Sequence, residues 1–218
     1  MEADLGDEVL KLAVIACEDS LKSYCDGMFL LKARPKEETI TDLISCSVAR
    51  ENVDNDANLI ILQTRSQESK SGADFILSIL SAAEKIENFH YQAKFLQESS
   101  LKQDSEFWNA IIYNSCQQYN ALVKSKNPRY IFFCHNKDGK TLQIRTVRAD
   151  EDIITKAIDL YSFSGSRKKG LHMKSQADQD KFNADASIAK TKYESAILDK
   201  DFCDDDFSLL LHEINLVY

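Results

Sequence analysis

The residues best suited to chemistry are carboxylates and amides on segments predicted to be neighbouring strands. Hydrolysis of a phosphodiester needs carboxylates that converge on one or two divalent metal ions, which stabilise the transferring phosphoryl group and generate the attacking hydroxide. Mg²⁺ and Mn²⁺ favour oxygen ligands. One frame of this kind is Asp42 followed by Gln63-Thr64-Arg65, and another is Arg129 followed by Gln143. His135, beside a predicted turn, could also ligate a metal.

The second frame lies in the stretch PRYIFFCHNKDGKTLQIRTVR, residues 128–148, which predicts a β-hairpin. A large class of metal-dependent nucleases carries its acids on such a hairpin, in the order P-D…(D/E)-x-K. Here the acid positions hold Arg129 and Gln143. Arginine is always protonated and would repel a cation, and a neutral amide lacks the charge that retains a metal. This frame therefore predicts a hairpin without catalytic ligands.

The other candidates each have a simpler structural interpretation. Asp42 and the polar residues 63–65 could face solvent, and Glu98 could be an isolated acid in a loop. The basic segment Arg167, Lys168 and Lys169 could contact phosphates or be solvated. The six cysteines show no C-x-x-C pair, which predicts free thiols in a reducing compartment.

The elements that must position these residues follow from the periodicity of apolar side chains. Strands are predicted at 41–49, 58–65, 128–148 (as the hairpin) and 159–164. Helices are predicted at 7–24, 71–89, 107–123, 150–156 and from about residue 175. The pattern predicts one α/β domain over residues 1–218, with a mixed β-sheet surrounded by helices. The apolar end FSLLLHEINLVY either packs back on the domain or marks a piece of a longer protein, and we expect the second.

Composition narrows the function classes. The formal net charge of −8 argues against nucleic-acid binding driven by overall charge, although a local basic patch remains compatible with it. The sequence has no run of 18 apolar residues, so we expect neither secretion nor a membrane span.

Four short stretches, taken in order, resemble the N-terminal endonuclease domain of the polymerase acidic (PA) subunit of orthomyxoviruses. They are TDLISC (41–46), FWNAIIYNSC (107–116), LQIRTVR (142–148) and IDLYSFSG (158–165). The resemblance implies a PD-(D/E)xK nuclease-like fold, the fold of the cap-snatching endonucleases, and active members of that family use two manganese ions. It also implies that the chain is cut from a longer polymerase subunit.

The resemblance places the family's metal and catalytic positions on Asp42, Glu98, Arg129, Gln143 and Lys156, which we call vestigial positions. Two of the family's carboxylates are replaced there, by Arg129 and Gln143, and the metal-binding histidine falls on Asp42. Loss of carboxylates and gain of an arginine at a site for divalent metals predicts no metal site and no activity by this mechanism. The thogotovirus branch (Thogoto and Dhori viruses), whose PA-like domain lacks the nuclease site, is the one that the sequence looks like.

The expectation from the resemblance is a catalytically inactive endonuclease-like domain with a structural or interaction role in a viral RNA-dependent RNA polymerase. It would bind other polymerase subunits and RNA, with no membrane and no cofactor, in the host nucleus and cytoplasm and in the virion. Arg145, Arg148, Arg167, Lys168 and Lys169 are candidate contacts for RNA or another anion. The alternatives are an active Mn²⁺- or Mg²⁺-dependent RNA endonuclease with rearranged ligands, drawn from Asp42, Glu98 and His135, or an unrelated α/β binding module.

Overall fold

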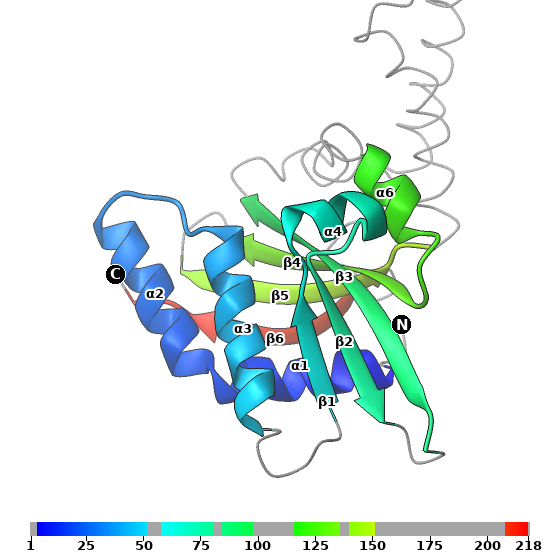
Figure 1. Cartoon of the computed structure of the whole chain (residues 1–218). Coiled ribbons are helices and arrows are strands. Elements are labelled where there is room, and N and C mark those ends of the chain that lie inside the picture. Colours follow the sequence, from blue (N-terminus) through cyan, green and yellow to red (C-terminus); the bar gives the residue numbers. More distant parts are fainter. Residues whose placement is uncertain are drawn as a thin grey trace, which may run out of the picture.

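A computed structural model describes residues 4–51, 58–80, 84–97, 116–135, 140–150 and 208–217 (Figure 1). These residues form a mixed sheet with helices around it, and so confirm the predicted α/β class. The strands are β1 (Asn58–Leu62), β2 (Phe75–Leu80), β3 (Ile86–Gln97), β4 (Pro128–His135), β5 (Thr141–Arg148) and β6 (Leu209–Asn215). The helices are α1 (Leu5–Ala16), α2 (Glu18–Leu30), α3 (Glu37–Glu51), α4 (Arg65–Ser71) and α6 (Cys116–Leu122).

The six strands lie in sequence order across the sheet, β1-β2-β3-β4-β5-β6. Neighbouring strands are antiparallel except for β3 and β4, which are parallel. A parallel pair needs a crossover connection, and α6 lies on the path between these two strands. β3 and β4 are the two middle strands of the sheet, and every residue of β4 is buried.

The main core lies between the sheet and helices α1, α2 and α3 (Figure 1). Buried side chains from α1 and α3 meet alternate residues of β2 and β3, because successive residues of a strand point to opposite faces. The core residues from these elements include Leu10, Val14, Ile40, Ile44, Val48, Phe75, Leu77, Phe89, Tyr91 and Ala93.

The prediction of a strand at 41–49 is wrong, because this segment lies in helix α3. Ile40, Ile44 and Val48 recur every four residues and are almost fully buried, so they form one apolar helix face. Glu37 and Glu38 in the first turn complement the positive end of the helix dipole. The β-branched residues that suggested a strand serve here as the buried face of a helix.

The prediction of a helix at 71–89 is also wrong, because these residues form β2 and the start of β3. Buried and partly buried residues alternate along FILSIL in β2. The preceding helix α4 ends at Gly72, which adopts the left-handed conformation with φ +71 and donates its N–H to Glu68. An added Cβ at Gly72 would lie 2.5 Å from the backbone nitrogen of Leu122 in α6, so a glycine lets these two helices approach closely.

The predicted hairpin at 128–148 is confirmed as β4 and β5, paired from Arg129 with Arg148 to His135 with Leu142. The apolar end of the chain packs back on the domain, since β6 pairs with β5. The predicted helix at 7–24 is divided at Cys17 into α1 and α2. The predicted elements at 150–156 and 159–164 lie outside the described residues, apart from Asp150 in the turn after β5, and so do residues 175–207, where a helix was predicted to begin.

Cys17, Cys25, Cys46 and Cys134 are free thiols, as predicted. None of the helices described has the length and apolar character needed to cross a bilayer.

Candidate functional site

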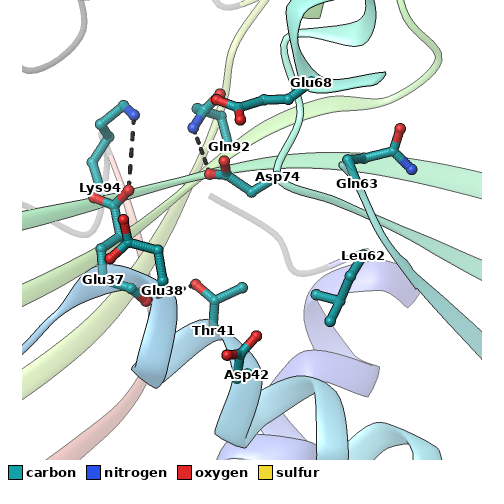
Figure 2. Close-up of a pocket in the computed structure, with 10 residues that line it drawn as sticks. All are labelled: Glu37, Glu38, Thr41, Asp42, Leu62, Gln63, Glu68, Asp74, Gln92 and Lys94. Carbon is teal, nitrogen blue, oxygen red and sulfur yellow. Dashed lines mark hydrogen bonds and ion pairs between the residues drawn. The ribbon is translucent and has the colours of Figure 1, made fainter. Parts of the chain in front are cut away.

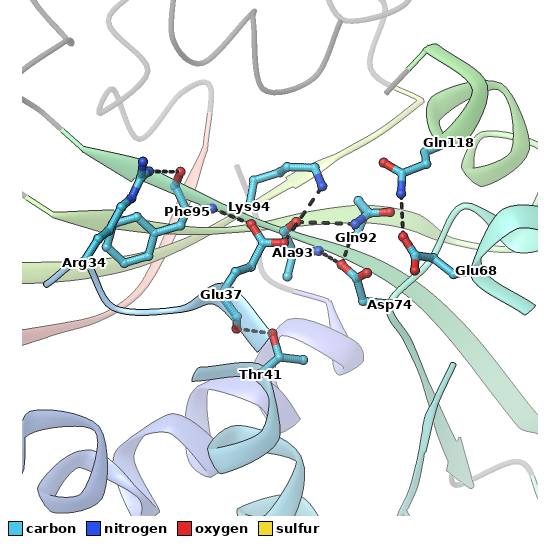
Figure 3. Close-up of polar contacts among 10 residues, drawn as sticks. All are labelled: Arg34, Glu37, Thr41, Glu68, Asp74, Gln92, Ala93, Lys94, Phe95 and Gln118. Carbon is cyan, nitrogen blue, oxygen red and sulfur yellow. Dashed lines mark hydrogen bonds and ion pairs between the residues drawn. The ribbon is translucent and has the colours of Figure 1, made fainter. Parts of the chain in front are cut away.

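The candidate site lies where β2 and β3 part. Their last paired residues are Phe75 and Tyr91, and β3 then continues to Gln97 with pairing only to β4. The backbone groups of β3 that would have bonded to β2 are instead bonded by side chains (Figure 3). The N–H of Ala93 donates to Asp74 over 2.7 Å, and the N–H of Phe95 donates to Glu37 over 2.7 Å. The free edge of one strand thereby fixes two carboxylates that are distant in sequence.

Asp74 is the residue that leads into β2. The same oxygen that accepts from Ala93 also accepts from Nε2 of Gln92, over 2.5 Å. Burial raises the pKa of Asp74 to about 6, although the nearby Lys94 ammonium and the hydrogen bond from Ala93 oppose the shift. Asp74 is therefore held in place beside Gln92 and Ala93 of β3, and part of its hydrogen-bonding capacity is already used.

Gln92 contributes an amide that is almost completely buried. Its exposed fraction is 1%, and its Oε1 has no hydrogen-bond partner in the structure. A buried polar atom without a partner costs on the order of 1–3 kcal/mol, so such an atom needs an explanation. This oxygen belongs to a side chain that lines the pocket described below.

Glu37 is the first residue of α3. One of its oxygens accepts from Phe95, and the other lies 4.0 Å from Nζ of Lys94. Burial raises the pKa of Glu37 to about 7; Lys94 lowers it, and Asp74 raises it further. Lys94 is two residues from Gln92 on the same strand, so both side chains point to the same side of the sheet.

These four residues border one pocket of about 350 Å³ (Figure 2). Three further carboxylates line it, Glu38 and Asp42 from α3 and Glu68 from α4. Thr41, Leu62 and Gln63 complete the wall. Glu68 is tied to α6, since it accepts a hydrogen bond from Gln118 over 2.5 Å. The pocket thus has an acidic lining with one ammonium, that of Lys94.

The donor set suits a hard divalent cation. Asp74 and Glu37 offer carboxylate oxygens, and Gln92 lines the same pocket with a side chain whose amide oxygen is buried without a partner. Within the described ranges no group of three or more His, Cys, Asp or Glu residues is close enough to hold a metal ion by itself. Mg²⁺-type ions often use only one or two carboxylates and complete their shell with water and substrate phosphate. The residues present therefore fit a cation that is shared with a substrate.

Of the vestigial positions predicted from the sequence, the structure places only Asp42 at this pocket. Arg129 lies on β4 with an exposed fraction of 5% and forms an ion pair with Asp4. Gln143 lies on β5 and donates to Glu213 over 2.7 Å. The hairpin β4-β5 therefore does not bring Arg129 and Gln143 to Asp42, in contrast to the predicted site. Glu98 and Lys156 lie outside the described residues.

The predicted anion contacts are also dispersed. Arg145 is buried and donates to the hydroxyl and carbonyl oxygens of Ser208 over 3.0 and 3.2 Å. Arg148 donates to Asp150. His135, considered as a metal ligand, is buried and stacks on Phe29 with ring centroids 4.2 Å apart. Arg167, Lys168 and Lys169 lie outside the described residues.

Glu37, Asp74, Gln92 and Lys94 were not among the site residues predicted from the sequence. The signal was present: an aspartate precedes one strand, and Gln92-Ala93-Lys94 follows on the next strand of a hairpin. Both were hidden because residues 71–89 were interpreted as a helix. The sequence-based prediction used the similar pattern of Asp42 and Gln63-Thr64-Arg65, which has Arg65 at the position that Lys94 occupies in the pattern of Asp74 and Gln92-Ala93-Lys94.

No curated protein matches the chain in a sequence comparison. A protein-family model does match, over residues 16–204, a range that contains all four residues of the site. The description of that family assigns it no function. The chain belongs to DUF6615, a family of unknown function.

Proposed function

We propose that the protein is a divalent-metal-dependent hydrolase of phosphodiester bonds in nucleic acid. The observation that carries the proposal is the convergence of Glu37, Asp74, Gln92 and Lys94 on one pocket where β2 and β3 part. The order of Asp74, Gln92 and Lys94 corresponds to P-D…(D/E)-x-K, with glutamine in place of the second acid. On this view the fold is of the PD-(D/E)xK nuclease type.

Asp74, Glu37 and Oε1 of Gln92 would hold the metal. A bound Mg²⁺ or Mn²⁺ would polarise the phosphodiester and lower the pKa of an attacking water. The protein's contribution is to fix the ligands: backbone N–H groups of Ala93 and Phe95 orient the two carboxylates before substrate arrives. Such preorganised dipoles lower the cost of reorganisation during the reaction.

Lys94 would act on the phosphate. Its side chain retains 15% exposure, and its ammonium lies 4.0 Å from Glu37. A cation at this place attracts the anionic diester into a pocket whose other charged groups are acidic, and it stabilises the additional negative charge of the transition state. In a P-D…(D/E)-x-K frame this is the one position that supplies positive charge.

The proposal shares metal-dependent cleavage with the active alternative, but its ligands are Glu37, Asp74 and Gln92 rather than Asp42, Glu98 and His135. The expectation of inactivity was based on Arg129 and Gln143, and neither lines the pocket. The relation to an orthomyxovirus polymerase subunit stays a prediction, together with its partner subunits and its nuclear and virion locations, because nothing in the family description bears on them.

A thermal melt with and without about 1 mM MnCl₂ tests metal binding directly. A metal at about 100 times its Kd stabilises the folded state by about 2.7 kcal/mol, which for a domain of this size raises Tm by about 5–10 °C. We expect this rise in the wild type and not in Asp74→Asn. The matched control is Glu87→Gln, which removes an exposed carboxylate from the other end of β3.

Cleavage of labelled DNA and RNA with Mg²⁺ or Mn²⁺ tests the activity. Lys94→Gln should keep the Mn²⁺-dependent rise in Tm and lose cleavage, since Lys94 is no ligand. Absence of cleavage by the wild type with either metal, on both nucleic acids and on a small diester, would refute the proposed function.

A further inference from the structure

Arg34 lies in the connection between α2 and α3, three residues before Glu37, and its side chain is exposed. It is nevertheless held in one place. Its Nη2 donates to the carbonyl oxygen of Phe95 over 3.0 Å, and its guanidinium carbon lies 4.8 Å from the centroid of the Phe95 ring. An exposed arginine fixed by both a hydrogen bond and a cation–π contact has lost most of its rotamer freedom before any ligand binds.

The same residue of β3 connects Arg34 to the candidate site. Phe95 accepts from Arg34 through its carbonyl and donates to Glu37 through its N–H (Figure 3). The N–H and C=O groups of Phe95 point to the same side, so the side chains of Glu37 and Arg34 that bond to them both lie along the free edge of β3. Arg34 is therefore positioned on the rim next to a proposed metal ligand, by the same strand that positions the ligand.

The connection that carries Arg34 has a defined conformation. The N–H groups of Lys32 and Ala33 donate back to α2 over 2.8 Å each, and the N–H of Lys36 donates to the Tyr24 hydroxyl over 2.8 Å. Pro35 is buried, while Lys32 and Lys36 are exposed on either side. This basic connection, residues 32–36, thus presents three cations beside a pocket whose wall is mainly acidic.

We propose that Arg34 binds a backbone phosphate of a polynucleotide, adjacent to the phosphodiester that occupies the pocket. This inference rests on the proposed function and specifies its substrate: a chain with phosphates flanking the scissile bond, rather than a mononucleotide or an isolated diester. A guanidinium has five N–H donors and one of them bonds to Phe95, so the others are available for phosphate oxygens. Lys32 and Lys36 add non-specific attraction.

The charge distribution gives a reason for such a contact. Glu38, Asp42 and Glu68 line the pocket and repel a polyanion, and the chain as a whole carries a net charge of −8. Binding of nucleic acid must then depend on local cations. In the basic connection, Phe95 holds Arg34 near the proposed metal ligand Glu37, and Lys32 and Lys36 are exposed on either side of Arg34 in the chain.

The test compares Arg34→Gln with Arg34→Lys and with the control Lys85→Gln. Lys85 is exposed at the β2-β3 turn, just before Ile86, and Phe95 lies nine residue steps or roughly 30 Å further along β3. Binding of short fluorescein-labelled oligonucleotides, DNA and RNA in separate arms, is measured by anisotropy in Ca²⁺ at several salt concentrations. Gels run afterwards verify that the probes are intact, and circular dichroism verifies that each variant is folded.

We expect Arg34→Gln to weaken binding about tenfold and to reduce the slope of log K against log[salt] by about 0.7–0.9. Arg34→Lys should retain the slope, and Lys85→Gln should resemble the wild type. Hydrolysis of bis(p-nitrophenyl) phosphate, a diester with no flanking phosphate, should be equal in the wild type and Arg34→Gln. A purely structural role for Arg34 would change stability without changing the salt slope.

The outcomes separate this inference from the proposed function. If the wild type binds neither oligonucleotide, or if Arg34→Gln leaves the salt slope unchanged, the phosphate site is refuted, whether or not the small diester is hydrolysed. If the slope depends on Arg34 but no diester is hydrolysed with any metal, the proposed function fails and the polynucleotide site stands. A slope that depends on Arg34 in one arm only identifies DNA or RNA as the ligand.

Discussion

Replacement of Gly72 by alanine tests whether the α4–α6 contact positions the site. Gly72 has φ +71, a conformation that costs an L-residue about 1–2 kcal/mol. Its added Cβ would also lie 2.5 Å from the backbone nitrogen of Leu122 and closer still to the carbonyl of Gln118. Both atoms are backbone, so α6 must shift, and overpacking of this kind costs about 1–3 kcal/mol.

The two costs together predict a loss of about 2–5 kcal/mol in the free energy of unfolding, or a fall of roughly 4–20 °C in Tm. Asp74 follows Gly72 by two residues, so the displacement should also reduce the Mn²⁺-dependent rise in Tm. Differential scanning calorimetry with and without MnCl₂ measures both effects in one series.

Gly27→Ala is the matched control. Gly27 lies inside α2, and an added Cβ there would meet nothing within 4 Å. A glycine inside a helix is less stable than alanine by about 0.5–1 kcal/mol, so this variant should be slightly more stable than the wild type. A Tm of Gly72→Ala within a degree of the wild-type Tm, or no lower than the Tm of Gly27→Ala, would contradict the close approach of α4 and α6.

Three other predictions concern charge. Burial raises the pKa of Asp7 from 3.8 to about 6, so the stability that the protonated Asp7 contributes is complete below about pH 4 and is lost as pH rises through 6. In Asp7→Asn the decrease of stability with rising pH should be smaller by up to about 3 kcal/mol. Urea titrations at about pH 5 and 8 that show the same loss of stability in the wild type and the variant would contradict this prediction. The pKa values of Glu37 and Asp74 are raised to about 7 and about 6, so protons compete with Mn²⁺ for these carboxylates. The Mn²⁺-dependent rise in Tm should therefore be larger at about pH 8 than at 5.5. An equal rise at both pH values would argue against Glu37 and Asp74 as ligands. Arg145→Met should lower stability by about 1–3 kcal/mol, because it removes the two buried hydrogen bonds from Arg145 to Ser208. Polynucleotide affinity should stay unchanged, and weaker binding would restore Arg145 as an anion contact.

The β4-β5 hairpin was predictable because its turn residues and its alternation agree. The segment at 71–89 was not, since Phe75, Ile76, Ile79 and Leu80 fit a helical period as well as a strand. The structure shows strict alternation in this segment, with Phe75, Leu77 and Ile79 buried. A short apolar run does not distinguish the two periods, and the neighbouring strands decide between them.

The candidate site was lost through that one misassignment. A helix over 71–89 separates Asp74 from Gln92 along the chain, whereas a hairpin places them side by side. Glu37 could not be predicted in either case, because its position depends on the packing of α3 against the sheet and on the free N–H of Phe95. Local patterns predict elements, but they do not predict which strand extends beyond its neighbour.

The free edge of β3 has a further consequence for any inactive variant. Strand edges with open N–H and C=O groups pair readily with other chains, and here the carboxylates of Asp74 and Glu37 occupy the N–H groups of Ala93 and Phe95. Alanine at either carboxylate would open this edge to intermolecular strand addition, while asparagine or glutamine can still accept the hydrogen bond. The residues proposed for catalysis would then also protect the protein from self-association.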